Sequence, residues 1–399
     1  MLALDKIYQA AYVLKGVARK TDVIAAPNLV PGIDDLYLKT ENLQVTGSFK
    51  LRGAFFKISQ LSQEELDRGI IACSAGNHAQ GVALAATRAG AKSIVFMPDG
   101  APIMKVENTR RLGAEVRLVK GTYDDAHDAC AAYQEESGAT LIHPYDDEDV
   151  IAGQGTVGLE IMDQLDGVDA VVVPIGGGGL ISGVACAVKS LKPDCKVYGV
   201  QAEGASAMAD AFHAGAWSAS DTADTFADGI QVKVPGETTF QMCQKYVDDI
   251  VTVSDDEVAA AILNLMEKQK VVSEGAGATP VAACMFNKLP LKGKRVVCVV
   301  SGGNIDVNIL SRVINSGLAM SGRKVTLAIH LTDKPGQLVQ VSTIIASQGA
   351  NVVSVDYDLS DPDLPISACT LRVGMETRDQ AQIDQIKAKL EEEGFAIVG

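Results

Sequence analysis

Short β-branched and aliphatic runs alternate with amphipathic stretches over about the first 310 residues of the chain. We expect strands at 70–73, 93–97, 115–119, 170–173, 196–200 and 295–300. The apolar spacing between them predicts helices, for example at 79–89, 124–136, 181–189 and 255–268. Apolar strands that alternate with helices indicate an α/β fold, in which helices cover both faces of parallel sheets.

These predicted strands fall into two blocks, near residues 70–142 and near 170–300. We therefore expect two lobes with a cleft between them: a small lobe at about 42–146 and a large lobe from the remainder of residues 1–316. Ligands of such sheets bind at the carboxyl ends of the strands.

The pattern changes after residue 316. Small residues, two glycines and two adjacent charges predict a linker at 317–324. Beyond it, residues 325–399 read as β-α-β-β-α-β over about 75 residues, which indicates a small ferredoxin-like domain.

Composition narrows the range of partners. The 399 residues include 35 basic and 50 acidic side chains, a net charge of −15, which disfavours nucleic-acid binding. No run reaches the roughly 18 apolar residues of a membrane span. The eight cysteines include no CxxC pair, so they predict no zinc site. We expect reduced, buried thiols in a cytoplasmic protein.

Two motifs in the small lobe carry chemistry. Lys50 follows Phe49 at an expected helix start, where burial or a nearby cation would make its amine a nucleophile. Taken alone, the motif favours an ordinary solvated lysine on an amphipathic helix. The run Ser74-Ala75-Gly76-Asn77-His78 joins a strand to a helix, where backbone N–H groups favour an anion such as a carboxylate. The alternative is a plain turn with Asn77 as the helix cap, and His78 could be structural or functional.

Two glycine-rich turns lie in the large lobe. The first, Gly176-Gly177-Gly178-Gly179-Leu180, follows a strand and fits a phosphate that touches bare backbone N–H groups, although a flexible turn is the alternative. It matches neither of the common nucleotide-binding motifs. The second turn, at 301–304, begins with Ser301 at another strand end.

Together these motifs resemble the fold-type II pyridoxal-phosphate enzymes, the tryptophan-synthase β family, and within it the threonine dehydratases (threonine ammonia-lyases). The resemblance runs over essentially the whole chain and rests on residues 41–54, the 74–81 turn and the tetraglycine, in this order. It implies a two-lobed fold of parallel sheets. It also implies pyridoxal phosphate bound to Lys50 as a Schiff base.

The resemblance gives each remaining motif a role. Phe49 would lie beside the cofactor ring, Asn77 would hydrogen-bond its phenolic oxygen, and Ser301 would face its pyridine nitrogen. Residues 176–180 would hold the phosphate, and the backbone of 74–78 would hold the substrate carboxylate. Lys50 would take the Cα proton of L-threonine, and elimination would give 2-oxobutanoate and ammonia, with L-serine to pyruvate as a side activity.

Relatives of this family leave alternatives open. Serine racemases resemble the chain, but they carry a Ser base where this chain has Ala75. Their metal site would begin at Glu203, yet Ala209 stands where an Asp is expected, so we expect no metal. A serine dehydratase, a β-replacement synthase and a non-catalytic amino-acid sensor are further alternatives. A dinucleotide oxidoreductase is remote, because no GxGxxG with a later acidic residue occurs.

The C-terminal domain resembles an ACT domain, the amino-acid-sensing module of many metabolic enzymes. Asp333, Gly336 and Asn351 fall where effector contacts are expected, and isoleucine or valine is the expected effector. This would place the enzyme in isoleucine biosynthesis under allosteric control. A dimerisation domain without a ligand is the alternative. Such modules pair through sheet edges, so we expect a homodimer or homotetramer.

Overall fold

The computed structural model describes residues 2–359, 365 and 367–398. The chain divides into two compact units, residues 1–307 and 308–399. The predicted boundary lay at 316. The difference arises because helix α13 (Val307–Met320) includes the first four residues of the predicted linker. Leu318, Ala319 and Met320 are good helix formers, and they extend this helix up to the turn at 321–322.

A six-stranded sheet forms the centre of the large lobe, in the order β1-β2-β10-β7-β8-β9. All neighbouring pairs are parallel except β1 with β2. The strands are β1 (Val23–Ala25), β2 (Leu36–Lys39), β7 (Ala170–Pro174), β8 (Lys196–Ala202), β9 (Asp249–Val253) and β10 (Val296–Val299). The strands expected at 170–173, 196–200 and 295–300 are thus present, whereas β1, β2 and β9 were not predicted.

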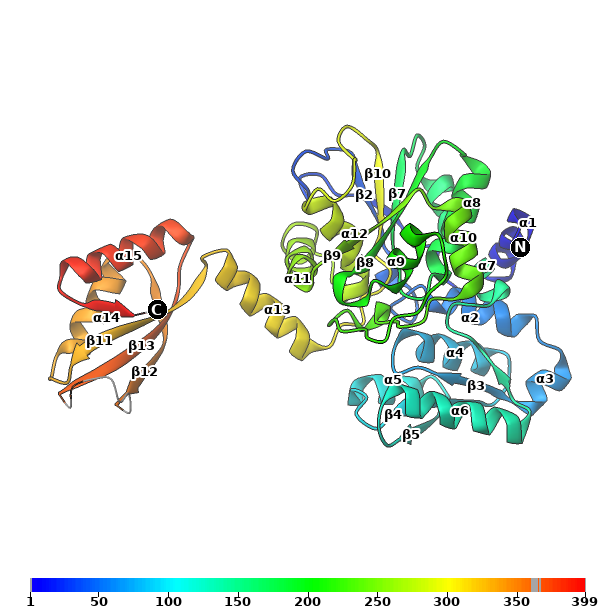
Figure 1. Ribbon diagram of the computed structural model, residues 1–399, viewed down its shortest axis with the longest axis horizontal. Coiled ribbons are helices and arrows are strands. Elements are labelled where there is room, and N and C mark those ends of the chain that lie inside the picture. Colours follow the sequence, from blue (N-terminus) through cyan, green and yellow to red (C-terminus); the bar gives the residue numbers. More distant parts are fainter. Residues whose placement is uncertain (1, 360–364, 366, 399) are drawn as a thin grey trace. The chain divides into compact units, whose positions relative to one another are not determined.

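The small lobe contains a four-stranded parallel sheet in the order β5-β4-β3-β6. Its strands are β3 (Ile70–Cys73), β4 (Ser93–Pro98), β5 (Glu115–Val119) and β6 (Thr140–Leu141). Three of the four coincide with predicted strands. β3 and β4 are short, mainly apolar runs, whereas β5 mixes Val116, Leu118 and Val119 with two charged residues. Figure 1 shows this sheet with α4 and α6 beside it.

Helices connect and cover both sheets. Those that lead to or leave the candidate site are α2 (Lys50–Ser59), α4 (Asn77–Arg88), α5 (Ile103–Arg111), α6 (Tyr123–Ser137), α7 (Glu148–Gln164), α8 (Gly179–Leu191) and α12 (Gly275–Met285). The remaining helices of this unit are α1 (Leu4–Val13), α3 (Gln63–Arg68), α9 (Ala207–Ala214), α10 (Glu237–Tyr246) and α11 (Asp255–Asn264). Short helical turns are η1 (Glu41–Leu43), η2 (Glu203–Ala205), η3 (Asp228–Ile230) and the π-turn η4 (Leu265–Gln269).

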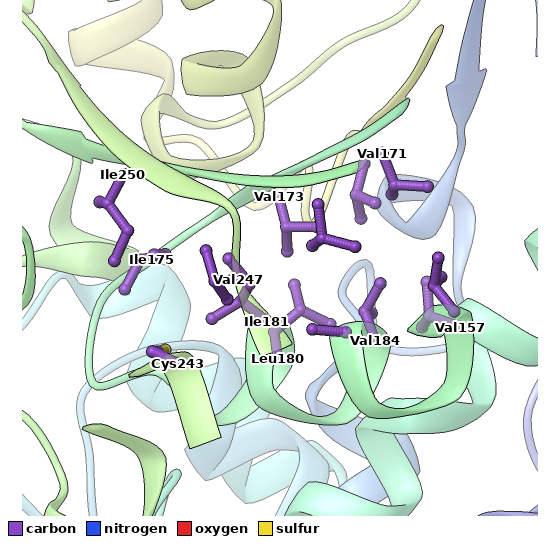
Figure 2. Close-up of a cluster of buried hydrophobic side chains, with 14 of the residues drawn as sticks. Val157, Val171, Val173, Ile175, Leu180, Ile181, Val184, Cys243, Val247 and Ile250 are labelled. Atoms are coloured by element: carbon purple, nitrogen blue, oxygen red, sulfur yellow. The ribbon is translucent and has the colours of Figure 1, made fainter. Parts of the chain in front are cut away.

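A buried apolar cluster fills the space between β7 and helix α8 (Figure 2). Val171 and Val173 of β7 belong to it together with Ile181 and Val184 of α8, and all four are fully buried. Every residue of β7 is buried, as expected for a central parallel strand covered on both faces. This packing fixes the point at which β7 ends and α8 begins.

The second unit has the βαββαβ order that the sequence predicts. Its elements after α13 are β11 (Lys324–Thr332), α14 (Gln337–Ser347), β12 (Asn351–Asp358), β13 (Ala368–Glu376), α15 (Gln380–Glu392) and β14 (Ala396–Val398). The antiparallel sheet has the order β12-β13-β11-β14. Its apolar core includes Ile329, Val341, Leu371 and Ile386. Across both units, no helix in the described part of the chain combines the length and apolar character that a membrane crossing requires.

Candidate active site

Three of the predicted motifs meet at one place. Ser48 pairs with Gly302 in an isolated antiparallel bridge, and the Phe49 N–H donates to the Ser301 carbonyl at 3.1 Å. The Asn304 side-chain amide donates to the Asn77 side-chain carbonyl at 2.7 Å. The segments around Lys50, Asn77 and Ser301 therefore lie together, although they are far apart in the sequence.

Lys50 is the first residue of α2 and is partly buried. Its Nζ donates to the Pro144 carbonyl at 2.7 Å and lies 5.3 Å from the centre of the Phe49 ring. Burial lowers the pKa of Lys50 to about 8, against the opposing charge of Glu274. An amine with this pKa is partly neutral near pH 8 and can act as a nucleophile or a base.

Asn77 is the first residue of α4, and Gly76 rather than Asn77 occupies the cap position. The Asn77 side chain makes no capping bond; its Nδ2 donates instead to Glu274 Oε1 at 2.7 Å. An uncapped helix start leaves its N–H groups available to an anion.

The turn before α4 keeps an open surface. Ser74, Ala75 and Gly76 are only partly buried, and a Cβ added to Gly76 would meet nothing within 4 Å. The Gly76 N–H donates to the Ser74 hydroxyl at 3.2 Å, which shapes the turn. Their assignment to substrate binding stays a prediction.

The His78 side chain has a structural contact. The ring is buried, and its Nε2 lies 2.7 Å from the Ile142 carbonyl at the end of β6. Burial, together with the Lys50 charge, lowers the pKa of His78 to about 3. The imidazole is therefore neutral near pH 7, and of His78 only the backbone fits the predicted substrate contact.

The tetraglycine turn needs bare backbone. Gly178 has a φ of +96° at the cap of α8, and a Cβ on Gly177 would lie 2.4 Å from the Tyr145 ring. A Cβ on Gly179 would come within 2.9 Å of Tyr145 Cα. Leu180 belongs to the apolar core, so only its backbone N–H can face a phosphate. The turn thus offers main-chain N–H donors at the start of a 13-residue helix.

Ser301 is 1% exposed at the end of β10, where it presents a neutral hydroxyl. Nearby, the buried Ser48 hydroxyl has no partner among the described residues. An amine of lowered pKa, an oriented amide, a helix start of bare glycine backbone and a neutral hydroxyl are the donor set that pyridoxal phosphate requires. The residues present therefore fit this cofactor.

Two groups at the site were missed by sequence reasoning. Glu274 is 3% exposed and contacts Asn77, and Tyr145 lies against the tetraglycine turn. A signal for Glu274 existed, because it is the single charge in the small and apolar run 271–284. An acidic side chain is rarely fully buried unless it has a polar or charged partner. Tyr145 carried no comparable signal.

In the second unit, Gly336 has a φ of +94° and caps α14, an 11-residue helix. The Asp333 N–H donates to the Ser367 carbonyl at 2.8 Å, and Asp333 is exposed. The Asn351 side chain donates to Glu376 at 3.2 Å. Their predicted effector role remains untested.

Comparison with known proteins identifies relatives. Residues 14–302 match the family model described as "Pyridoxal-phosphate dependent enzyme". An L-threonine ammonia-lyase from Thermotoga maritima is 48% identical over 399 residues, covering 100% of this chain and 99% of that protein. An L-threonine ammonia-lyase from Geobacter sulfurreducens is 40% identical over 398 residues, covering 100% of this chain and 99% of that protein.

Solved structures of two further proteins are also similar to this chain. Threonine deaminase isoform 2 from Solanum lycopersicum has a TM-score of 0.72 at 39% identity, covering 78% of this chain and 93% of that one. Maize serine racemase has a TM-score of 0.74 at 33% identity, covering 80% of this chain and 98% of that one.

Proposed function

Because the chain belongs to the pyridoxal-phosphate-dependent enzymes, we propose that it is an L-threonine ammonia-lyase, which converts L-threonine into 2-oxobutanoate and ammonia. The observation that carries the proposal is the Lys50 amine, whose pKa is about 8 and which lies at the same site as Asn77 and Ser301. Relatives named for this activity span the whole chain.

Each residue of the site has a task in this reaction. Lys50, Asn77, Ser301 and the 176–179 turn would hold pyridoxal phosphate, which supplies an electron sink when bound. The start of α4 would hold the substrate carboxylate through its N–H groups. Lys50, with its lowered pKa, would take the proton from the substrate Cα. Ser301 would face the pyridine nitrogen of the cofactor, and its neutral hydroxyl adds no charge there.

L-serine is a proposed second substrate that would give pyruvate. The two amino acids differ by one methyl group, which is worth only about 1–3 kcal/mol in an apolar pocket. The site as described contains no feature that would exclude the smaller side chain. We therefore expect measurable turnover of both.

Racemisation of serine is the second candidate, since maize serine racemase shares the fold at 33% identity. That reaction needs a base on the face opposite Lys50. Ala75, where the resemblance places the Ser of the racemases, carries no proton. This supports elimination over racemisation.

We further propose that the second unit is an ACT domain that regulates the enzyme through bound isoleucine or valine, within a homodimer or homotetramer acting in isoleucine biosynthesis. The βαββαβ order and the cap of α14 at Gly336 support this proposal. Isoleucine and valine should change the initial rate, and Asp333→Ala should abolish that response while leaving the basal rate unchanged.

Eight reduced, buried cysteines support a cytoplasmic location.

A product assay tests the proposed activity. The purified holoenzyme is incubated separately with L-threonine and L-serine, and 2-oxo acid, ammonia and D-serine are quantified. We expect equimolar 2-oxobutanoate and ammonia from L-threonine and little D-serine. D-serine as the main product would favour the racemase, and no turnover of either substrate would favour the sensor.

A further inference from the structure

Glu274 is a buried carboxylic acid that the proposed reaction does not use. It caps α12, and its carboxyl lies in space that two glycines leave open. A Cβ on Gly302 would lie 2.3 Å from Oε1, and one on Gly229 would lie 3.4 Å from it. The fold therefore makes room for this side chain at the centre of the site.

The contacts of Glu274 determine how the Asn77 amide is oriented. Glu274 Oε1 accepts from Asn77 Nδ2 at 2.7 Å, and the Glu274 carboxylate also accepts from the Asn304 backbone N–H. The Asn304 side chain donates to Asn77 Oδ1 at 2.7 Å and to the Thr46 carbonyl at 2.9 Å. Both ends of the Asn77 amide are thus engaged, and one of its two N–H groups remains to donate elsewhere.

Three charged groups act on Glu274 from other elements. Asp228 of η3 and Lys105 of α5 form an ion pair with each other, and Lys50 lies at the start of α2. Burial first, and the Asp228 charge second, raise the pKa of Glu274 to about 7, against the hydrogen bond from Asn77 and the Lys105 charge. The carboxyl therefore changes charge near pH 7.

We propose that Glu274 is a positioning residue whose carboxylate orients the Asn77 amide so that the remaining Asn77 N–H donates to the cofactor. The inference rests on the proposed function only in assigning Asn77 to the cofactor. A hydrogen bond to an ionised acceptor is about twice as strong as a neutral one. Protonation of Glu274 therefore loosens Asn77 and alters the electronic environment of the bound cofactor.

The absorbance spectrum of the bound cofactor tests this without any substrate. In the wild-type holoenzyme we expect a spectral transition between pH 6 and 8.5. Glu274→Gln keeps an acceptor for Asn77 but cannot ionise, so its spectrum should stay in the low-pH form of the wild type. Glu136→Gln, an exposed change on α6, should leave the transition intact.

Kinetic measurements provide a second test of the role proposed for Glu274. Glu274→Gln should lower kcat on L-threonine at pH 8 by about tenfold, the effect of one hydrogen bond to a charged group, with little change in KM. Glu274→Asp keeps the charge and should retain a transition with a displaced midpoint.

A wild-type spectrum that is constant from pH 6 to 8.5 overturns the proposal without any variant, as does an unchanged transition in Glu274→Gln. Because the spectrum needs no turnover, failure of the product assay would refute the proposed function and leave this result standing.

Discussion

The Lys50 amine donates to the Pro144 carbonyl at 2.7 Å, although 94 positions separate the two residues. This contact joins the start of α2 to the loop before α7. The next residue of that loop, Tyr145, lies against Gly177 and donates its hydroxyl to the Val234 carbonyl at 2.8 Å. One loop therefore connects the proposed nucleophile with the proposed phosphate turn.

The tetraglycine should tolerate no side chain. Gly177→Ala would place a methyl group 2.4 Å from the Tyr145 ring, whose hydroxyl is held in place. Such overpacking costs about 1–3 kcal/mol. Because the strain falls on the turn that would hold the phosphate, the dissociation constant for pyridoxal phosphate should rise by about 5- to 150-fold. Titration of the cofactor-free protein, followed by absorbance, measures this change.

The matched control is Gly100→Ala, whose added Cβ meets nothing within 4 Å. This variant should bind the cofactor as the wild type does. Equal affinity of Gly177→Ala and the wild type would show that the turn does not contact the phosphate.

The buried ion network behind the site should dominate stability. Arg52 is 1% exposed, donates to both carboxylate oxygens of Glu41 at 2.8 Å, and donates to Glu160 at 2.6 Å. Arg52→Met leaves Glu41 buried without its guanidinium partner, which costs about 3–5 kcal/mol. Urea denaturation should show this loss in the free energy of unfolding.

A surface pair provides the comparison for Arg52. Arg68 donates to Glu64 at 2.8 Å on the exposed face of α3, so Arg68→Met should change stability by no more than about 1 kcal/mol. Similar losses in the two variants would contradict the importance assigned to the buried network.

His78 should make stability depend on pH. Its pKa is about 3 when folded and about 6.5 when unfolded, so below pH 6.5 the unfolded chain binds a proton that the folded protein does not. The free energy of unfolding should therefore fall as pH falls, by up to about 2 kcal/mol between pH 7 and 5.

Denaturation of the wild type and of His78→Gln at both pH values isolates this contribution. Gln retains a donor for the Ile142 carbonyl but does not titrate in this range, so the pH-dependent loss should be smaller in the variant. An identical pH dependence of the two proteins would mean that the pKa of His78 is the same in the folded and unfolded states, which contradicts this prediction.

The sequence predicted the features that depend on local pattern. It predicted the apolar runs of β3, β7 and β10 and the turns that follow them. Buried strands and turns of this kind depend on the types of consecutive residues, which the sequence shows directly. Helix α7 was not predicted. Gly153 and Gly155 lower its helix propensity, and they are present because α7 crosses α2 and α8 at close range.

Long-range contacts explain the rest of what the sequence could not predict. Asn77 and Glu274 are 197 positions apart, and only the packing of the two lobes brings the carboxyl to the amide. The same holds for Tyr145, whose position against Gly177 depends on the path of a loop. Side-chain partners of this kind require the tertiary structure.

Release of 2-oxobutanoate from L-threonine by the wild type, by Lys50→Ala and by Lys57→Ala tests the central claim most directly. Lys57 lies on the same helix and forms ion pairs with Asp147 and Asp149, away from the proposed chemistry. We predict that Lys50→Ala lowers the rate by about 100- to 10,000-fold, as expected for loss of the catalytic base, and that Lys57→Ala retains activity. Wild-type turnover that persists in Lys50→Ala, or no 2-oxobutanoate from the cofactor-loaded wild type, would contradict the account.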